Sequence, residues 1–121
     1  MATTITTQAT PLSQRIIKIT SLSTTPADHV TGTNGAWTSI AIDNSANGHI
    51  TYLRVWDNVD PTNGTTDPDW IISVAASSSS TVVIPGGAAF SNGISFSAQR
   101  DAGTAGTTAP AGAVNVDIVT S

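Results

Sequence analysis

The chain has 121 residues and a mass of 12.3 kDa, which is the size of a single domain. Only 10% of its residues are charged, against about 25% in typical soluble domains, and the net charge is −4. This balance excludes the clustered Lys and Arg of a nucleic-acid binder, and the lack of cysteine excludes disulfides and thiolate metal sites.

The composition predicts an all-β protein. Glutamate is absent, lysine occurs once, and the polar residues are mostly Thr and Ser, with Val and Ile at many apolar positions. β-Branched side chains fit a pleated sheet better than a helix. No apolar run approaches the ~18 residues of a membrane-spanning helix, and the N-terminal residues lack the pattern of a secretion signal. We therefore expect neither a membrane anchor nor secretion by that route.

Residues 1–14 are polar, rich in threonine and contain Pro11. They are expected to form an extended N-terminal arm that is mobile in the isolated protein. Residues 15–121 are expected to form one β-sandwich domain.

Strand signals follow along the rest of the chain, bounded by turn residues. Their ranges are 15–23, 36–43, 48–57, 69–75, 80–84, 93–99 and 113–120. Several alternate between apolar and polar residues; Val116 and Ile118, for example, flank Asp117. This period of two is typical of antiparallel sheets with one buried face. The spacing predicts a β-sandwich or a jelly roll of about seven to eight strands, and the sequence leaves these two open.

Asn-Gly pairs occur between the expected strands, where they favour tight turns because both residues tolerate positive φ. The segment from Asn44 to Gly48 is predicted to be the turn of a hairpin. That hairpin would pair the strand carrying Ile40 and Ile42 with the strand carrying Leu53.

Residues 58–68 and 100–112 do not have a strand pattern. The first contains Pro61, Gly64 and Pro68, and the second is rich in Ala, Gly and Thr. Connections this long in a compact domain are usually functional or packed on something.

Residues for catalysis are few. His29 and His49 are the only histidines, and no Gly-x-Ser-x-Gly motif is present. A catalytic Ser-His-Asp set therefore lacks a marked nucleophile, and we expect no enzyme. His29 is expected in a loop and His49 at the start of a strand.

Four aspartates cluster near the 58–68 connection: Asp57, Asp60, Asp67 and Asp69. They are the only weak candidates for a calcium site, because carboxylates on a loop suit a hard cation. The spacing does not follow the EF-hand pattern, and Asp commonly begins turns by bonding nearby backbone. The favoured interpretation is turn formation, with no metal and no cofactor. The Asn63-Gly64-Thr65 sequon is interpreted as a turn.

The aromatic residues are candidates for contact with a partner. Alternation places Tyr52, Arg54 and Trp56 on one face of their strand, and Trp70 and Ile72 are expected to continue that face. Tyr, Trp and Arg are enriched at interface hot spots, so this face could meet another subunit or stack on a sugar. The alternative is that Trp56 belongs to the core of a two-layer sandwich. Trp37 is expected in the core.

The outward strand positions are predicted to carry Ser, Thr, Asn and Gln. These side chains cost less to desolvate than ions, and the chain lacks the lysines that monomers place on edge strands. The composition therefore favours a subunit that is covered by neighbours in an assembly.

Four segments of the chain resemble a family of small virion proteins of tailed bacteriophages. They are Ile50 to Asn58, residues 61–68, Trp70 to Val74, and Ile84-Pro-Gly-Gly-Ala-Ala-Phe-Ser-Asn-Gly-Ile-Ser-Phe. The resemblance covers roughly residues 48–120. It is a likeness of composition and spacing, and residues 1–35 add nothing to it.

The resemblance implies a β-sandwich subunit on the outer surface of the virion capsid, made in the host cytoplasm. Its implied role is that of a decoration, or cement, protein, with the major capsid protein and further copies of itself as partners, most often as a trimer. Tyr52, Arg54, Trp56 and Trp70 are the expected contact residues. A carbohydrate-binding module of a tail or fibre, with Trp56, Trp70 and Tyr52 as its sugar platform, is the alternative function, and a small hydrolase is a third.

Overall fold

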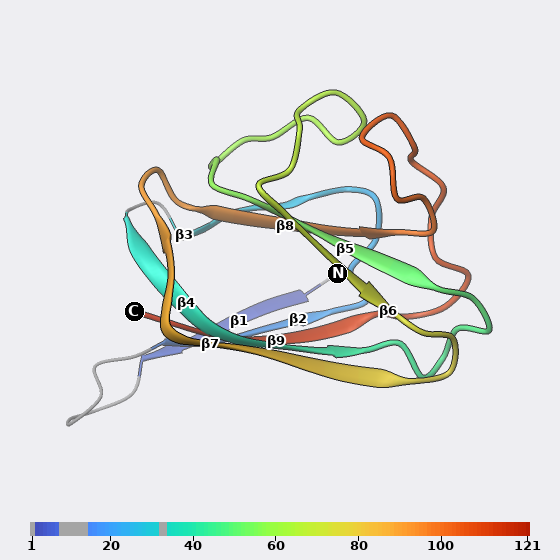
Figure 1. The fold of residues 1–121 in the computed structure, drawn as a ribbon, viewed down its shortest axis with the longest axis horizontal. Helices are drawn as coiled ribbons and strands as arrows, with labels where there is room; N and C mark the ends of the chain where they lie inside the picture. The colour runs from blue at the N-terminus through green and yellow to red at the C-terminus, as the bar shows by residue number, and fades with distance from the viewer. Residues whose placement is uncertain (1, 8–14, 32–33) are drawn as a thin grey trace.

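A computed structural model describes residues 2–7, 15–31 and 34–121. Two antiparallel sheets lie face to face (Figure 1), so the predicted β-sandwich is confirmed. The strands are β1 (Ala2–Thr7), β2 (Arg15–Thr20), β3 (Ala27–Thr31), β4 (Gly35–Asp43), β5 (Thr51–Trp56), β6 (Trp70–Val74), β7 (Ser79–Phe90), β8 (Ile94–Gln99) and β9 (Asn115–Thr120). All seven predicted strands are present, with ends shifted by up to six residues.

The strand order is β1-β2-β9-β4-β7 in one sheet and β3-β8-β5-β6 in the other. β2 pairs with β9, β3 with β8, β4 with β7 and β5 with β6, all antiparallel. These four pairs are nested, as in one long hairpin that closes between β5 and β6. Pairing of β1 with β2, of β4 with β9 and of β5 with β8 completes the two sheets.

The core lies between the sheets and is built by alternation along each strand. In β9, Val116 and Ile118 are buried whereas Asn115 and Asp117 are exposed, as the sequence predicts. In β8 both faces are buried, including the polar side chains of Ser95, Ser97 and Gln99. The connections 57–69 and 100–112 rise over the outer face of this sheet (Figure 1). We call these two connections the loop layer.

Residues 2–7 of the expected arm form an edge strand, in register with β2 from Ala2↔Thr20 to Thr7↔Arg15. Alternating β-branched residues suit a strand, and β2 offers it a row of backbone hydrogen-bonding groups. The expected arm is therefore part of the sheet over residues 2–7. Residues 8–14 of that arm lie outside the described residues.

The predicted hairpin at Asn44–Gly48 is wrong. β4 and β5 belong to different sheets, so this segment crosses between the layers. The buried amide of Asn44 donates to the carbonyls of His49 and Ala75, both at 3.0 Å, and accepts from Thr51 Oγ1 at 2.7 Å. These bonds hold a turn that leads away from the sheet rather than back along it.

β7 extends beyond the predicted 80–84 because it passes through Pro85-Gly86-Gly87 instead of ending there. Its pairing with β4 jumps from Ser39↔Val83 to Trp37↔Ala88, so the intervening residues form a bulge. Gly86 and Gly87 have φ of 82° and 83°, and β7 is an edge strand where proline costs no ladder hydrogen bond.

Candidate interaction surface

Arg54 holds the loop layer onto the four-stranded sheet. Its side chain leaves the outer face of β5 and is completely buried. The guanidinium donates to the carbonyl of Thr104 at 3.0 Å, of Gly106 at 2.8 Å and of Asp101 at 3.4 Å, and also to that of Gly103. A planar cation with five donors can satisfy several carbonyls at once, so it fixes the path of the 100–112 connection.

Asn63 joins the second connection to the same cluster. Its Oδ1 accepts from Arg54 Nη1 at 2.7 Å. Its Nδ2 donates to the carbonyl of Thr24 at 2.8 Å and to Oε1 of Gln99 at 3.1 Å. The predicted turn at Asn63-Gly64 is confirmed, with Gly64 at φ 92°. The amide of Asn63 therefore ties that turn to two strands and a loop.

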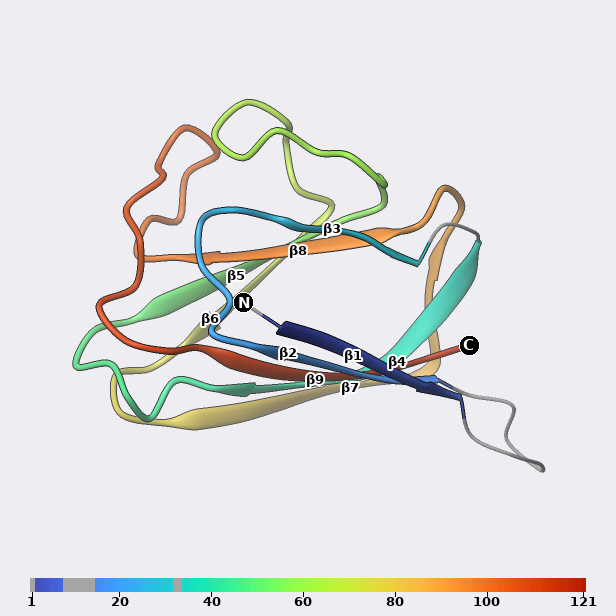
Figure 2. The ribbon, with the colours of Figure 1, turned by 180° about the vertical axis from the view of Figure 1, so that it is seen from behind.

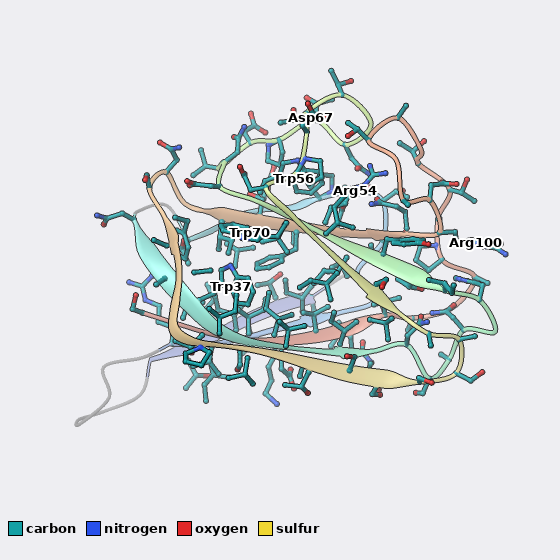
Figure 3. The ribbon with its side chains drawn as sticks, in the orientation of Figure 1. Trp37, Arg54, Trp56, Asp67, Trp70 and Arg100 are labelled. Atoms are coloured by element: carbon teal, nitrogen blue, oxygen red, sulfur yellow. The ribbon has the colours of Figure 1, made fainter. Side chains whose placement is uncertain are left out.

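The two connections also contact each other near their tips. Thr104 Oγ1 donates to Oδ1 of Asp67 at 2.8 Å. Figure 3 shows Arg54 and Trp56 beneath these loops and Asp67 on the loop of the 57–69 connection. Nine of the thirteen exposed residues of the layer are small and uncharged: Thr62, Thr65, Ala102, Gly103, Ala105, Thr107, Thr108, Ala109 and Ala111. The other four are Asp60, Asp67, Asp69 and Arg100. The layer is thus a surface of hydroxyl and methyl groups with four charged side chains among them.

Electrostatics support this arrangement. Burial lowers the pKa of Arg54, whereas the nearby charge of Asp101 works against that shift. Arginine stays protonated even so, because a guanidinium gives up its proton only in strongly basic solution. Hydrogen bonds from Thr108, followed by the charges of Arg54 and Arg100, lower the pKa of Asp101.

The predicted contact residues do not form one platform. Tyr52, Arg54 and Trp56 do share the outer face of β5, but Arg54 and Trp56 are fully buried and Trp56 Nε1 donates to the carbonyl of Thr66 at 3.0 Å. Tyr52 is half-buried. The interface role of these residues stays a prediction, and Arg54 and Trp56 could reach a partner only if the loops opened.

Trp70 was expected on the same face, and this expectation is wrong. Trp70 is paired directly with Val55, which faces the core, so Trp70 faces the core as well. Ile72 is paired with Leu53 and faces the core for the same reason. There Trp70 packs edge-on against Trp37, with ring centroids 5.8 Å apart and planes at 89° (Figure 3). Trp37 is 1% exposed, so its predicted place in the core is confirmed.

Three carboxylates of the aspartate cluster bond backbone or hydroxyl groups. Asp57 accepts the N–H groups of Ser91 and Asn92, at 2.8 to 3.0 Å. Asp69 accepts the N–H of Asp57 at 2.6 Å, and Asp67 accepts from Thr104. Asp60 is exposed. Within the described residues, no group of three or more His, Asp, Glu or Cys residues is arranged to hold a metal ion.

The two histidines lie on different segments of the chain. His29 belongs to β3, so the expected loop position is wrong. His49 precedes β5 instead of beginning it, since that strand starts at Thr51. Its Nε2 accepts from the N–H of Ala111 at 3.2 Å, and Nδ1 lies 2.9 Å from the carbonyl of Ile50. This geometry assigns the proton to Nδ1, which makes His49 a tie between two loops.

Sequence reasoning missed a groove of about 270 Å³ on the outer face of the five-stranded sheet. Its lining residues come from β4, β7 and β9 and the ends of these strands: Ala41, Ile42, Asp43, Ser79, Ser80, Thr81, Asn115 and Asp117. Asp43 accepts hydrogen bonds from Ser45 and Ser79, which lower its pKa. The period-two pattern marks Ala41, Asp43 and Asp117 as outward-facing, but their meeting depends on a strand order that the pattern does not contain.

Comparison with protein-family models, with curated proteins and with solved structures found no match. The described residues contain no helix of the length and apolarity that crossing a membrane requires.

Proposed function

We propose that this chain is a structural virion protein of a tailed bacteriophage, which decorates and stabilises the outer capsid surface by non-covalent contacts. The observation that carries the proposal is the loop layer. A buried cation holds it on the sandwich through several hydrogen bonds, and nine of its thirteen exposed residues are small and uncharged. The uncharged part of such a surface loses little solvation and little entropy when a partner covers it.

The strand connections support the same class of protein. A long hairpin of four nested pairs, rolled into two sheets, is the connectivity that we assign to a jelly roll. Jelly rolls are used in viral capsid and lectin domains. We therefore take the finer description of the fold to be a jelly roll with β1 added at one edge.

The distribution of charge also favours assembly. Of the four cationic residues in the chain, Arg54 is completely buried and Arg15 is half-buried. Several aspartates accept hydrogen bonds from backbone N–H groups of other residues. A dissolved monomer normally carries interspersed surface charges of both signs. Weak contacts repeated around a shell would instead give this subunit its affinity, through avidity.

The carbohydrate-binding alternative required an exposed aromatic platform. Trp56 is fully buried and Trp70 faces the core. Of the three aromatic residues proposed for that platform, only Tyr52 is half-exposed on the outer face. The geometry therefore favours the capsid role.

The test compares shells assembled with and without the chain. Shells that lack it are expected to burst at lower temperature or osmotic stress, and addition of the purified chain is expected to restore them. Thr65→Lys and Thr107→Lys place a charge on the loop layer and should abolish restoration. Val83→Lys, on the exposed edge strand β7, is the matched control and should restore normally. Shells that are equally robust with and without the chain would overturn the proposal.

A further inference from the structure

β1 is an edge strand without the usual features that prevent pairing with another chain. Among the described strands it has a neighbour on one side only, β2, and its register with β2 is unbroken over six residue pairs. Its sequence, Ala-Thr-Thr-Ile-Thr-Thr, contains no charge, proline or glycine. Natural proteins protect an edge with lysines, prolines, bulges or short length, because its free N–H and C=O groups accept a further strand.

The other edges in the described part of the chain carry such protection. β7 is bulged at Pro85-Gly86-Gly87. β3 pairs irregularly with β8 and carries the exposed Asp28. β6 has five residues and begins next to the exposed Asp69. The contrast points to β1 as the edge open to pairing.

Ile5 adds an apolar contact to this edge. It pairs with Ile17, so it lies on the core-facing side of its sheet. Ile17 is completely buried, whereas Ile5 is 48% exposed. The sheet that contains β1 has five strands and the facing sheet has four. Figure 2 shows β1 at the margin of the sandwich, beside β2.

We propose that β1 pairs antiparallel with β1 of a second copy, across a twofold axis perpendicular to the sheet. Such an axis keeps each face of the sheet on the same side, so Ile5 of both copies lies on the inner face. The register that pairs Ile5 with its own counterpart also pairs Thr4 with Thr6 of the second copy. Directly opposed side chains have Cβ atoms about 4.5–5.5 Å apart, so the two isoleucines cover each other.

Charge does not oppose this pairing. The nearest exposed cation is Lys18 on β2, opposite Thr4. Two copies of β2 would be separated by three strand spacings, roughly 14 Å, which exceeds the Debye length of about 8 Å at physiological salt. Each Lys18 also has Asp117 opposite it on β9. β1 itself brings no ion to the contact.

The resulting assembly is a dimer with a continuous ten-stranded sheet, in place of the trimer that the family resemblance implies. The inference deepens the proposed function by naming how two copies associate. It does not depend on which shell they cover.

The test uses the absence of cysteine from the chain. Ile5→Cys is expected to form a disulfide-linked dimer on removal of reductant, because residue 5 faces itself across the axis. Thr4→Cys is the register control: the two thiols would be offset by two residues along the strands, beyond the ~7 Å Cα separation that a disulfide spans. Val83→Cys, at an exposed position on β7, measures how much crosslinking arises from random collision. Both controls should remain uncrosslinked; crosslinking at Thr4 instead of Ile5 would overturn the proposed register.

Light scattering tests association without any crosslink. The unmodified chain should have twice the 12.3 kDa mass of one copy, and Ile5→Lys should reduce it to a monomer with an unchanged circular-dichroism spectrum. Val83→Lys should remain dimeric. A monomeric or trimeric unmodified chain would overturn the pairing. A monomer that still stabilises shells would leave the proposed function standing, and a dimer that never stabilises them would overturn that function alone.

Discussion

Arg54 Nη1 donates a hydrogen bond of 2.7 Å to Oδ1 of Asn63, and this bond joins the centre of β5 to the connection that covers it. The same guanidinium also bonds carbonyls of the 100–112 connection. One side chain therefore holds both halves of the loop layer, which makes it the natural first target for mutation.

Arg54→Met should lower the free energy of unfolding by about 3 kcal/mol, because the part-buried carbonyls of the 100–112 connection lose their donor. Arg54→Lys should restore only part of this loss, since an ammonium group lacks the planar fork of the guanidinium. Arg100→Met is the control, because Arg100 is exposed, and should change stability by less than about 0.5 kcal/mol. Urea unfolding measures all three; equal losses in the Arg54 and Arg100 variants would contradict the role of Arg54.

Trp56→Phe should destabilise the chain more than Trp37→Phe, by about 1 kcal/mol. Both indoles are buried, but Trp56 Nε1 bonds the carbonyl of Thr66, whereas Trp37 Nε1 has no hydrogen-bond partner among the described residues. Phenylalanine removes a hydrogen bond in the first case and an unsatisfied donor in the second. Chemical denaturation followed by circular dichroism compares them, and the reverse order would disprove this account.

Gly93→Ala should lower the free energy of unfolding by several kcal/mol or prevent folding. Gly93 is buried at φ 130°, and an added Cβ would overlap the carbonyl oxygen of Thr31 and a methyl group of Val59. Gly48→Ala is the matched control, because no atom lies within 4 Å of its Cβ position. Thermal melting should show a large loss in Gly93→Ala and almost none in Gly48→Ala; similar melting of the two variants would refute the prediction.

Acid should loosen the 100–112 connection through Asp101. Its pKa is lowered in the folded chain, so the ionised carboxylate stabilises the fold above the usual value of about 3.9. That contribution is lost as the pH falls through the lowered pKa of the folded state. Hydrogen exchange at the Thr108 amide, which donates to Asp101 at 2.7 Å, should reveal the loosening.

Asp101→Asn should remove this part of the pH dependence, whereas Asp60→Asn, in the other connection, should keep it. Persistence of the same acid response in Asp101→Asn would assign it to another group.

The strands could be predicted from the sequence where one face is buried and the other is exposed, as in β9 around Asp117. The second half of the edge strand β7 could not, because Pro85 and two glycines resemble a turn unless the strand is known to lie at a margin. Whether a strand continues through proline and glycine depends on its position in the sheet rather than on local propensity.

The candidate surface was less predictable than the strands. Short hairpin loops set the register of their strands, but the connection between Val55 and Trp70 is long and leaves the register undetermined. Trp70 was therefore assigned to the wrong face. The burial of Arg54 depends on carbonyls about 50 positions away in the chain, which no local pattern contains.

The nesting of the pairs also constrains how the chain folds. Ile17 and Ile118 are directly paired, although almost the whole chain separates them. β9 lies between β2 and β4, so these two strands have no common neighbour until β9, which follows both in the chain, is made. Such high contact order slows folding. The five-stranded sheet can therefore close only after the ribosome has released β9, and chains that stop before it should be substrates for proteases.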